Sequence, residues 1–209
     1  MYVFDYSECL DLIQEVVTAA EGDLVFEVTE ELSEEGLYNR RASSQELVRF
    51  CKKVLTVGIV TAIVYNAYRD SDKYYETMLN LIVSKAEEYM NELVMLDVIY
   101  EEDDLAYTSD WAAFVPDNLP FNIRCTTDIM DIAEIIGGQV LETIHQVDFY
   151  EDPEFKRIVR TVNRLHSRTY GIPKHPPELD IDLTTRSYTM TEYKPRRRVS
   201  HESNRAVRH

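Results

Sequence analysis

The sequence lacks the features that mark secreted and loop-rich proteins. Three cysteines (Cys9, Cys51 and Cys125) are far apart and odd in number, which excludes a disulfide framework and predicts buried free thiols in a reducing compartment. Six glycines and seven prolines in 209 residues argue against a loop-rich β fold. The first residues carry acids in place of a basic start and an apolar run, so they do not form a secretory signal. We therefore expect a cytoplasmic location, or a place in a particle assembled inside the cell.

The usual signatures of catalysis are also missing. The chain has no GxxxxGK[ST] or GxGxxG loop for nucleotides, and no GxSxG, HExxH or paired CxxC motif. One ExxH occurs at Glu142–His145, but di-metal helical bundles need a second copy and two further glutamates. We accordingly predict no catalytic, cofactor-binding or metal-binding residue and no enzyme. The 38 acidic residues still leave chance acid–base pairs open.

Charge is distributed unevenly along the chain. The net charge of −16 combines two regions of opposite sign. Residues 1–150 carry 9 Lys/Arg and 30 Asp/Glu, a balance of −21, whereas residues 151–209 carry 13 Lys/Arg and 8 Asp/Glu, a balance of +5. The first region should repel nucleic acid and anionic membranes, and the second should attract them. The simpler alternative is that the basic region folds back onto the acidic body of the same chain.

Apolar residues recur at steps of three and four along most of residues 1–170, which predicts amphipathic helices. The expected helices run from Ser7 to Gly22, from Asp23 to Gly36, and onward from Ser43, Asp72, Ser109, Thr127 or Asp128, and Asp152. Gly137-Gly138 interrupts one of them and indicates a kink or a close helix crossing, with a functional hinge as the alternative. The fold class predicted is therefore mainly α, an irregular bundle of about six to seven helices. An acidic helical body (1–170) would be followed by an extended C-terminal tail (171–209) with a candidate strand.

The segment Val54–Tyr65 is apolar on every side. A central helix buried all round is the interpretation we favour. A buried strand is the first alternative, because most of these residues are β-branched. A membrane span is the second, although the run is shorter than the roughly 20 residues that a span requires.

A basic amphipathic helix is predicted after Asp152-Pro153, which together form a strong helix start. One side of this helix is apolar, and the other carries a candidate surface for phosphates or a protein partner. Its residues are Lys156, Arg157, Arg160, Arg164 and Arg168. The alternative is that this surface docks onto the acidic body.

The tail changes character beyond Gly171. A stiff proline-containing linker precedes ELDIDLTTRSYTMTEY, which has the composition of a strand but no obvious partner nearby, so it could pair with the sheet of another subunit. Residues 194–209 are basic. The partner-binding residues predicted in the tail are Leu179, Ile181, Leu183, Tyr188, Tyr193, Arg196, Arg197 and Arg198.

Three classes of function fit this sequence. We favour a non-catalytic structural, assembly or adaptor protein, whose acidic body sits in a larger complex and whose tail docks onto a partner subunit. Virion connectors and accessory subunits share that general architecture. The partners expected are other protein subunits or further copies of the chain, and a membrane is not expected. One alternative is a nucleic-acid-associated protein that uses the basic helix at 153–170 and the tail at 194–209. The other is an enzyme or small-ligand protein with an unrecognised site.

Overall fold

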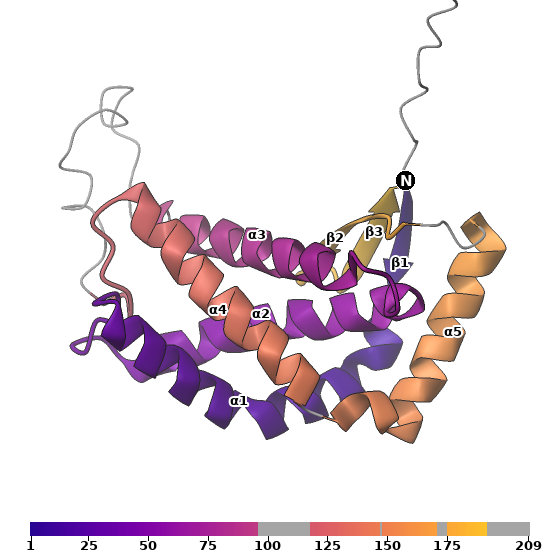
Figure 1. Cartoon of the computed structure of the whole chain (residues 1–209), viewed down its shortest axis with the longest axis horizontal. Coiled ribbons are helices and arrows are strands. Elements are labelled where there is room, and N and C mark those ends of the chain that lie inside the picture. Colours follow the sequence, from indigo (N-terminus) through magenta and orange to yellow (C-terminus); the bar gives the residue numbers. More distant parts are fainter. Residues whose placement is uncertain (96–117, 147, 171–174, 192–209) are drawn as a thin grey trace, which may run out of the picture.

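The computed structural model describes residues 1–95, 118–146, 148–170 and 175–191. This part of the chain forms five α-helices, three short 3-10 helices and one small sheet (Figure 1). The helices are η1 (Ser7–Cys9), α1 (Leu10–Glu34), α2 (Ser44–Tyr65), η2 (Asn66–Tyr68), α3 (Tyr74–Met95), α4 (Thr126–Gln146), η5 (Asp148–Glu151) and α5 (Pro153–Tyr170). The strands are β1 (Tyr2–Asp5), β2 (Glu178–Asp182) and β3 (Ser187–Thr191). The prediction of a mainly α fold is confirmed.

The first two predicted helices are one continuous helix, α1. The predicted end at Gly22 is wrong, because a glycine inside a helix costs only about 1 kcal/mol relative to alanine and the buried stripe continues past it. Gly36 does follow the helix end, and its φ of +72° is one that residues with a side chain rarely adopt. The short helix predicted from Ser109 lies outside the described residues. These two differences account for five α-helices where about six to seven were expected.

Helix α2 forms the centre of the bundle, with α1, α3 and α4 packed around it. Its start is fixed by Ser43, whose hydroxyl accepts a hydrogen bond of 3.3 Å from the Gln45 backbone N–H. Its second half is buried all round, so the prediction of a buried central helix at Val54–Tyr65 is confirmed. The polar Thr61 is tolerated there because its hydroxyl donates to the Val57 carbonyl at 2.7 Å. None of the helices in the described ranges combines the length and apolarity needed to cross a bilayer.

Glycine allows α3 and α4 to approach closely. A methyl group at Gly137 would lie 2.6 Å from Val83 Cγ2 and 3.3 Å from the Val83 backbone. A methyl group at the adjacent Gly138 would meet nothing within 4 Å. Helix α4 runs unbroken through both residues, so the predicted interruption is a close crossing made by Gly137.

The tail segment predicted as a strand folds as a hairpin, β2–β3, against the N-terminus of its own chain. Strand β3 lies between β1 and β2, antiparallel to both, with Phe4 and Ile181 each opposite Tyr188. The hydroxyl of Tyr65 at the end of α2 donates to the Pro177 carbonyl at 2.6 Å. The expectation of no local partner is wrong, because the two halves of the segment, β2 and β3, pair with each other. The first residues of the chain supply the second neighbour of β3.

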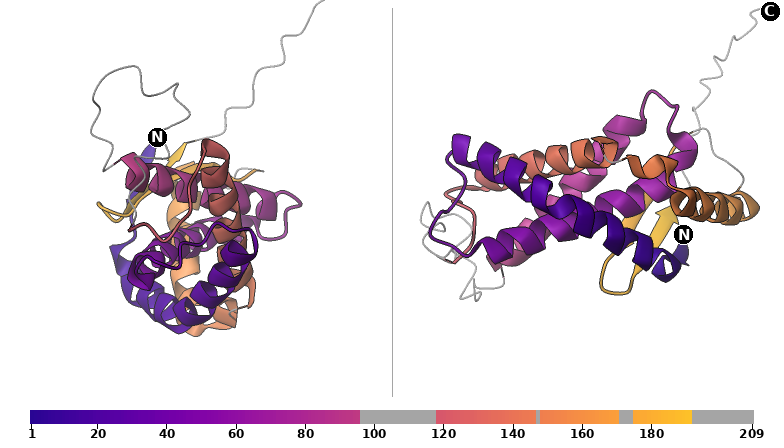
Figure 2. Two further views of the ribbon diagram at one scale, coloured as in Figure 1. Left: turned by 90° about the vertical axis from the view of Figure 1, so that its left-hand side faces the viewer. Right: turned by 90° about the horizontal axis from the view of Figure 1, so that it is seen from below.

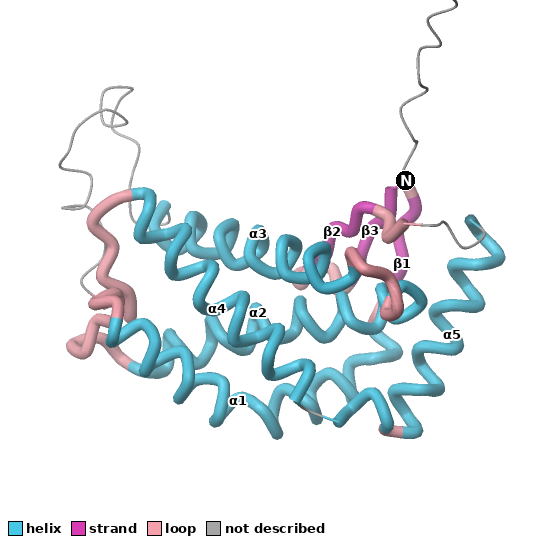
Figure 3. The backbone as a smooth tube through the Cα atoms, in the orientation of Figure 1, coloured by secondary structure: helices cyan, strands magenta, loops and turns pink. Residues whose placement is uncertain are grey.

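The two ends of the molecule differ in structure. The sheet and α5 lie toward one end of the long axis, whereas the C-terminus of α1 and the N-terminus of α4 lie at the other (Figures 1 and 2). Figure 3 shows the loop after α1 beside the loop before α4 at that second end. These loops are joined by hydrogen bonds from the Asn122 side chain to the carbonyls of Gly36 and Tyr38, at 3.1 and 2.9 Å.

Candidate interaction surface

Helix α5 begins as the sequence predicts. The Asp152 carboxylate accepts hydrogen bonds from the backbone N–H groups of Glu154 and Phe155, at 2.7 and 3.0 Å, and Pro153 occupies the first helical position. Phe155, Ile158 and Val159 are buried, and α5 packs against the central α2. Because this apolar side faces the body, the opposite side faces solvent.

The far end of α5 is held by a buried aromatic cluster. His166 Nε2 lies 2.7 Å from the Tyr188 hydroxyl, which is hydrogen-bond distance. The Phe4 ring stacks on Tyr188 with centroids 5.2 Å apart and meets His166 edge-on at 4.7 Å. Burial lowers the pKa of His166 to about 4, so its ring is neutral at pH 7. The cluster joins α5 to strands β1 and β3, and it explains why this part of the tail belongs to the folded body.

The five predicted basic residues of α5 share one exposed or half-exposed side, which we call the basic face: Lys156, Arg157, Arg160, Arg164 and Arg168. Four of them follow each other at steps of four, so they form one row along the helix. The first two cations of the basic face form ion pairs with carboxylates of α5 or of the residues just before it. Lys156 pairs with Glu151 at 2.5 Å, and Arg157 pairs with Glu154.

The remaining three cations, Arg160, Arg164 and Arg168, are exposed. Within the described ranges no carboxylate lies within ion-pair distance of any of them. The structure therefore does not place this part of the basic face against the acidic body of its own chain.

The predicted tail residues fall into three groups. Ile181 and Tyr188 are buried in the core of their own chain. Leu179 and Leu183 are partly buried and pack against that core. Tyr193 and Arg196–Arg198 lie outside the described residues, so they stay predictions. For Ile181 and Tyr188 the interior contacts occupy the side chains that a partner would need.

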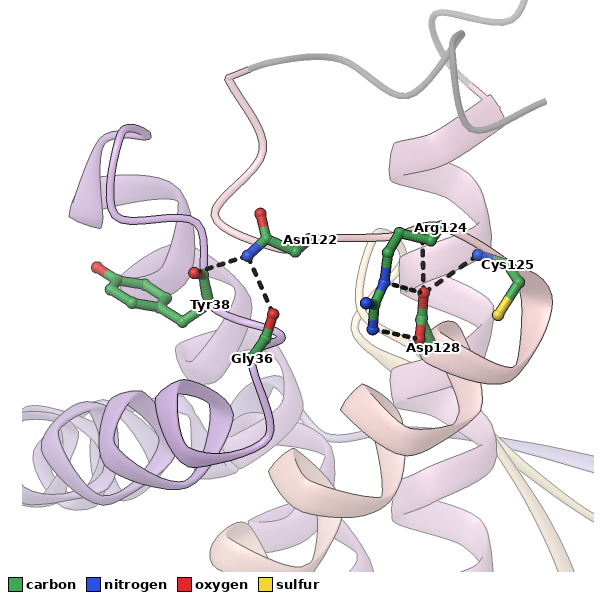
Figure 4. A network of polar contacts seen from close by, with 6 residues as sticks. All are labelled: Gly36, Tyr38, Asn122, Arg124, Cys125 and Asp128. Carbon is green, nitrogen blue, oxygen red and sulfur yellow. Dashed lines mark hydrogen bonds and ion pairs between the residues drawn. The ribbon is translucent and has the colours of Figure 1, made fainter. Parts of the chain in front are cut away.

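Acidic side chains gather at the opposite end of the molecule, around an open hollow of about 570 Å³ between α1 and α4. Its acidic lining comes from both helices: Glu31, Glu35, Asp128, Asp131 and Glu134. Asp128 also holds the start of α4, because its carboxylate accepts hydrogen bonds from the backbone N–H groups of Arg124 and Cys125, at 2.7 and 3.1 Å (Figure 4). Burial raises the pKa of Asp128, but these bonds and the Arg124 side chain outweigh it and hold the pKa below its usual value.

No group of metal-ligating side chains occurs in the described part of the chain. His145 of the single ExxH is half-buried, with Nδ1 2.6 Å from the Leu141 carbonyl and its ring 4.6 Å from that of Tyr75. Cys9 and Cys51 are buried free thiols, and burial raises their pKa to about 11 and about 12, which disfavours the reactive thiolate. Cys125 is exposed, contrary to the expectation of burial.

Comparisons of the chain with protein-family models, with curated proteins and with solved structures find no match.

Proposed function

We propose that the protein is a non-catalytic assembly or adaptor protein that docks onto an acidic protein surface through the basic face of α5. The observation that carries this proposal is the exposed row of Arg160, Arg164 and Arg168 at one end of a molecule whose net charge is −16. These cations are presented on a helix anchored at both ends, so their positions are set before any partner binds.

The cations along the basic face repel one another. Cations four residues apart on a helix repel each other, at roughly 0.2–0.5 kcal/mol per pair. Lys156, Arg160, Arg164 and Arg168 make three such pairs in succession. A row of exposed cations that repel one another supports a role in binding an anionic surface.

Nucleic acid is the alternative anionic partner for the same row. Arginine binds phosphates as readily as carboxylates, and positively charged surfaces of this kind contact nucleic-acid backbones. The acidic body weighs against it, because the −21 balance over residues 1–150 would repel a polyanion that extends beyond α5. A protein surface that ends at the edge of the basic face avoids this repulsion.

Fluorescence anisotropy with labelled single-stranded and duplex oligonucleotides distinguishes the two partners. At about 50 and about 200 mM salt we expect no binding that depends on the basic face. Binding that weakens steeply with salt, and that is lost in the variant Arg160→Glu/Arg164→Glu, would replace the assembly proposal with a nucleic-acid function. The matched control is Arg40→Glu/Arg41→Glu, which changes the net charge equally at two exposed arginines outside α5.

A further inference from the structure

The chain carries two exposed surfaces of opposite charge at opposite ends of its long axis. The basic face of α5 lies at one end, and the C-terminal half of α1 lies at the other (Figures 1 and 2). Residues 1–39 contain no Lys or Arg, so no cation of α1 offsets its acids. The molecule is therefore electrically polar along its length.

The exposed side of the second half of α1 is mostly acidic, although the cation Arg124 lines the adjoining hollow. We call this side the acidic face; its residues are Asp23, Phe26, Glu27, Glu30, Glu34 and Glu35, and Asp131 and Glu134 of α4 adjoin it. Acids at the C-terminus of a helix oppose the helix dipole, and the last turn of α1 has no basic residue to compensate. A cationic partner would relieve both this opposition and the mutual repulsion of the carboxylates.

The two faces match in length and in chemistry. The cations from Lys156 to Arg168 span 12 residues, as do the carboxylates from Asp23 to Glu35, which is about 18 Å of helix in each case. Phe26 is 59% exposed on the acidic face and Leu165 is 48% exposed beside the basic face. An exposed aromatic ring among carboxylates offers arginine a cation–π contact in addition to ion pairs.

We infer that the surface which receives the basic face of α5 is the acidic face of a second copy of the chain. This inference rests on the proposed function and names its partner. Two bodies of net charge −16 repel each other in most orientations, and the contact of α5 with α1 brings opposite charges together. The contact joins different surfaces of the two copies, so it is heterologous and leaves one basic and one acidic face free at the ends of each dimer. Copies would therefore add head to tail, into a ring or a filament.

Charge reversal on each face, followed by mixing, tests this inference in sedimentation velocity. Variant A is Arg160→Glu/Arg164→Glu on the basic face, and variant B is Glu35→Lys/Glu134→Lys at the acidic face. The unaltered protein should associate as its concentration rises, and salt should reverse the association. Variants A and B should each remain monomeric alone. A mixture of both should associate again, because every contact between A and B pairs opposite charges.

The control variant Arg40→Glu/Arg41→Glu carries the same change of net charge as variant A, in the loop after α1. It adds negative charge near the acidic face, so it should not reduce association. A loss of association in this control equal to that in variant A would show that net charge, not the basic face, governs self-assembly, and would overturn the inference.

Zero-length carbodiimide cross-linking of an isotopically mixed sample identifies the contact directly. Lys156 should couple within one chain to Glu151, its ion-pair partner, which serves as an internal control. Between chains it should couple to carboxylates of the acidic face.

A monomer at every concentration, or a mixture of A and B that fails to associate, would overturn the second-copy inference. If the oligonucleotides also remain unbound, the proposed function stands with another acidic protein as the partner; oligonucleotide binding lost in variant A would overturn both.

Discussion

At the scale of single residues, His166 connects the basic helix to the sheet. Its ring lies against Phe4 and Tyr188, which come from the two ends of the described chain. Neither the sequence pattern around His166 nor that around Phe4 indicates this contact, because the two residues are 162 positions apart in the chain. Long-range pairs of this kind depend on the whole fold, and local periodicity does not report them.

We predict that His166 makes the stability of the protein depend on pH. Its pKa is about 4 in the folded chain and near 6.5 in the unfolded chain, so the unfolded chain binds more protons between these values. The free energy of unfolding should therefore fall as the pH is lowered through this window, by about 2 kcal/mol between pH 7 and pH 5. Urea denaturation at both pH values measures the change. In the variant His166→Gln, the unfolding free energy should change much less between the two pH values. An equal change in this variant would show that other groups are responsible.

The adjacent glycines of α4 make a matched pair of variants. Gly137→Ala places a methyl group 2.6 Å from Val83 Cγ2, and the nearby Val83 backbone cannot move aside as a flexible side chain could. We expect this variant to lose roughly 1–3 kcal/mol of unfolding free energy through overpacking. Gly138→Ala has free space and should gain up to about 1 kcal/mol from helix propensity. Thermal denaturation compares them, and equal midpoints would contradict the close crossing.

At the scale of elements, the helices were predictable and the sheet was not. The apolar run at Val54–Tyr65 located the buried part of α2, and the Asp152-Pro153 pair located the start of α5. Helix α1 continues past Gly22 and ends at Glu34, two residues before Gly36, because its exposed side tolerates a glycine and its buried stripe continues beyond Gly22. Strand β1 was missed because four residues are too few for a period, and its partner β3 lies near the other end of the chain.

The candidate site was predictable in composition but not in position. The spacing of Lys156, Arg160 and Arg164 was enough to group them on one side of a helix. The sequence could not show whether that side faces the acidic body, and the structure leaves its last three arginines exposed. The acidic hollow between α1 and α4 was missed altogether, because its lining residues are about 100 positions apart.

Two truncations test where the folded body ends. A chain of residues 1–191 retains both strands of the hairpin and should unfold at the same denaturant concentration as the full chain. A chain of residues 1–176 loses the buried Ile181, Tyr188 and Met190 and uncovers Phe4. Its free energy of unfolding should be lower by several kcal/mol, because each large apolar side chain that is no longer buried removes roughly 1.5–3 kcal/mol of stabilisation. Equal stability of the two truncations would show that the hairpin is dispensable.

Across the whole molecule, the distribution of charge is the feature that bears most on assembly. The acids of the second half of α1 and the arginines of α5 lie at opposite ends of the long axis, and most of them are exposed. The acids at the end of α1 oppose its helix dipole, and the cations four residues apart on α5 repel one another. Both groups are therefore understood as surfaces for contacts between molecules.

The measurement that tests the central claim most directly is size-exclusion chromatography of the full chain with light scattering, recorded at protein and nucleic-acid absorbance wavelengths. We predict a species heavier than the 24.4 kDa protomer and free of nucleic acid, which returns to the protomer mass in Arg160→Glu/Arg164→Glu. Co-eluting nucleic acid that high salt removes would contradict the assembly function, and the same mass for both proteins would contradict self-association through the basic face of α5.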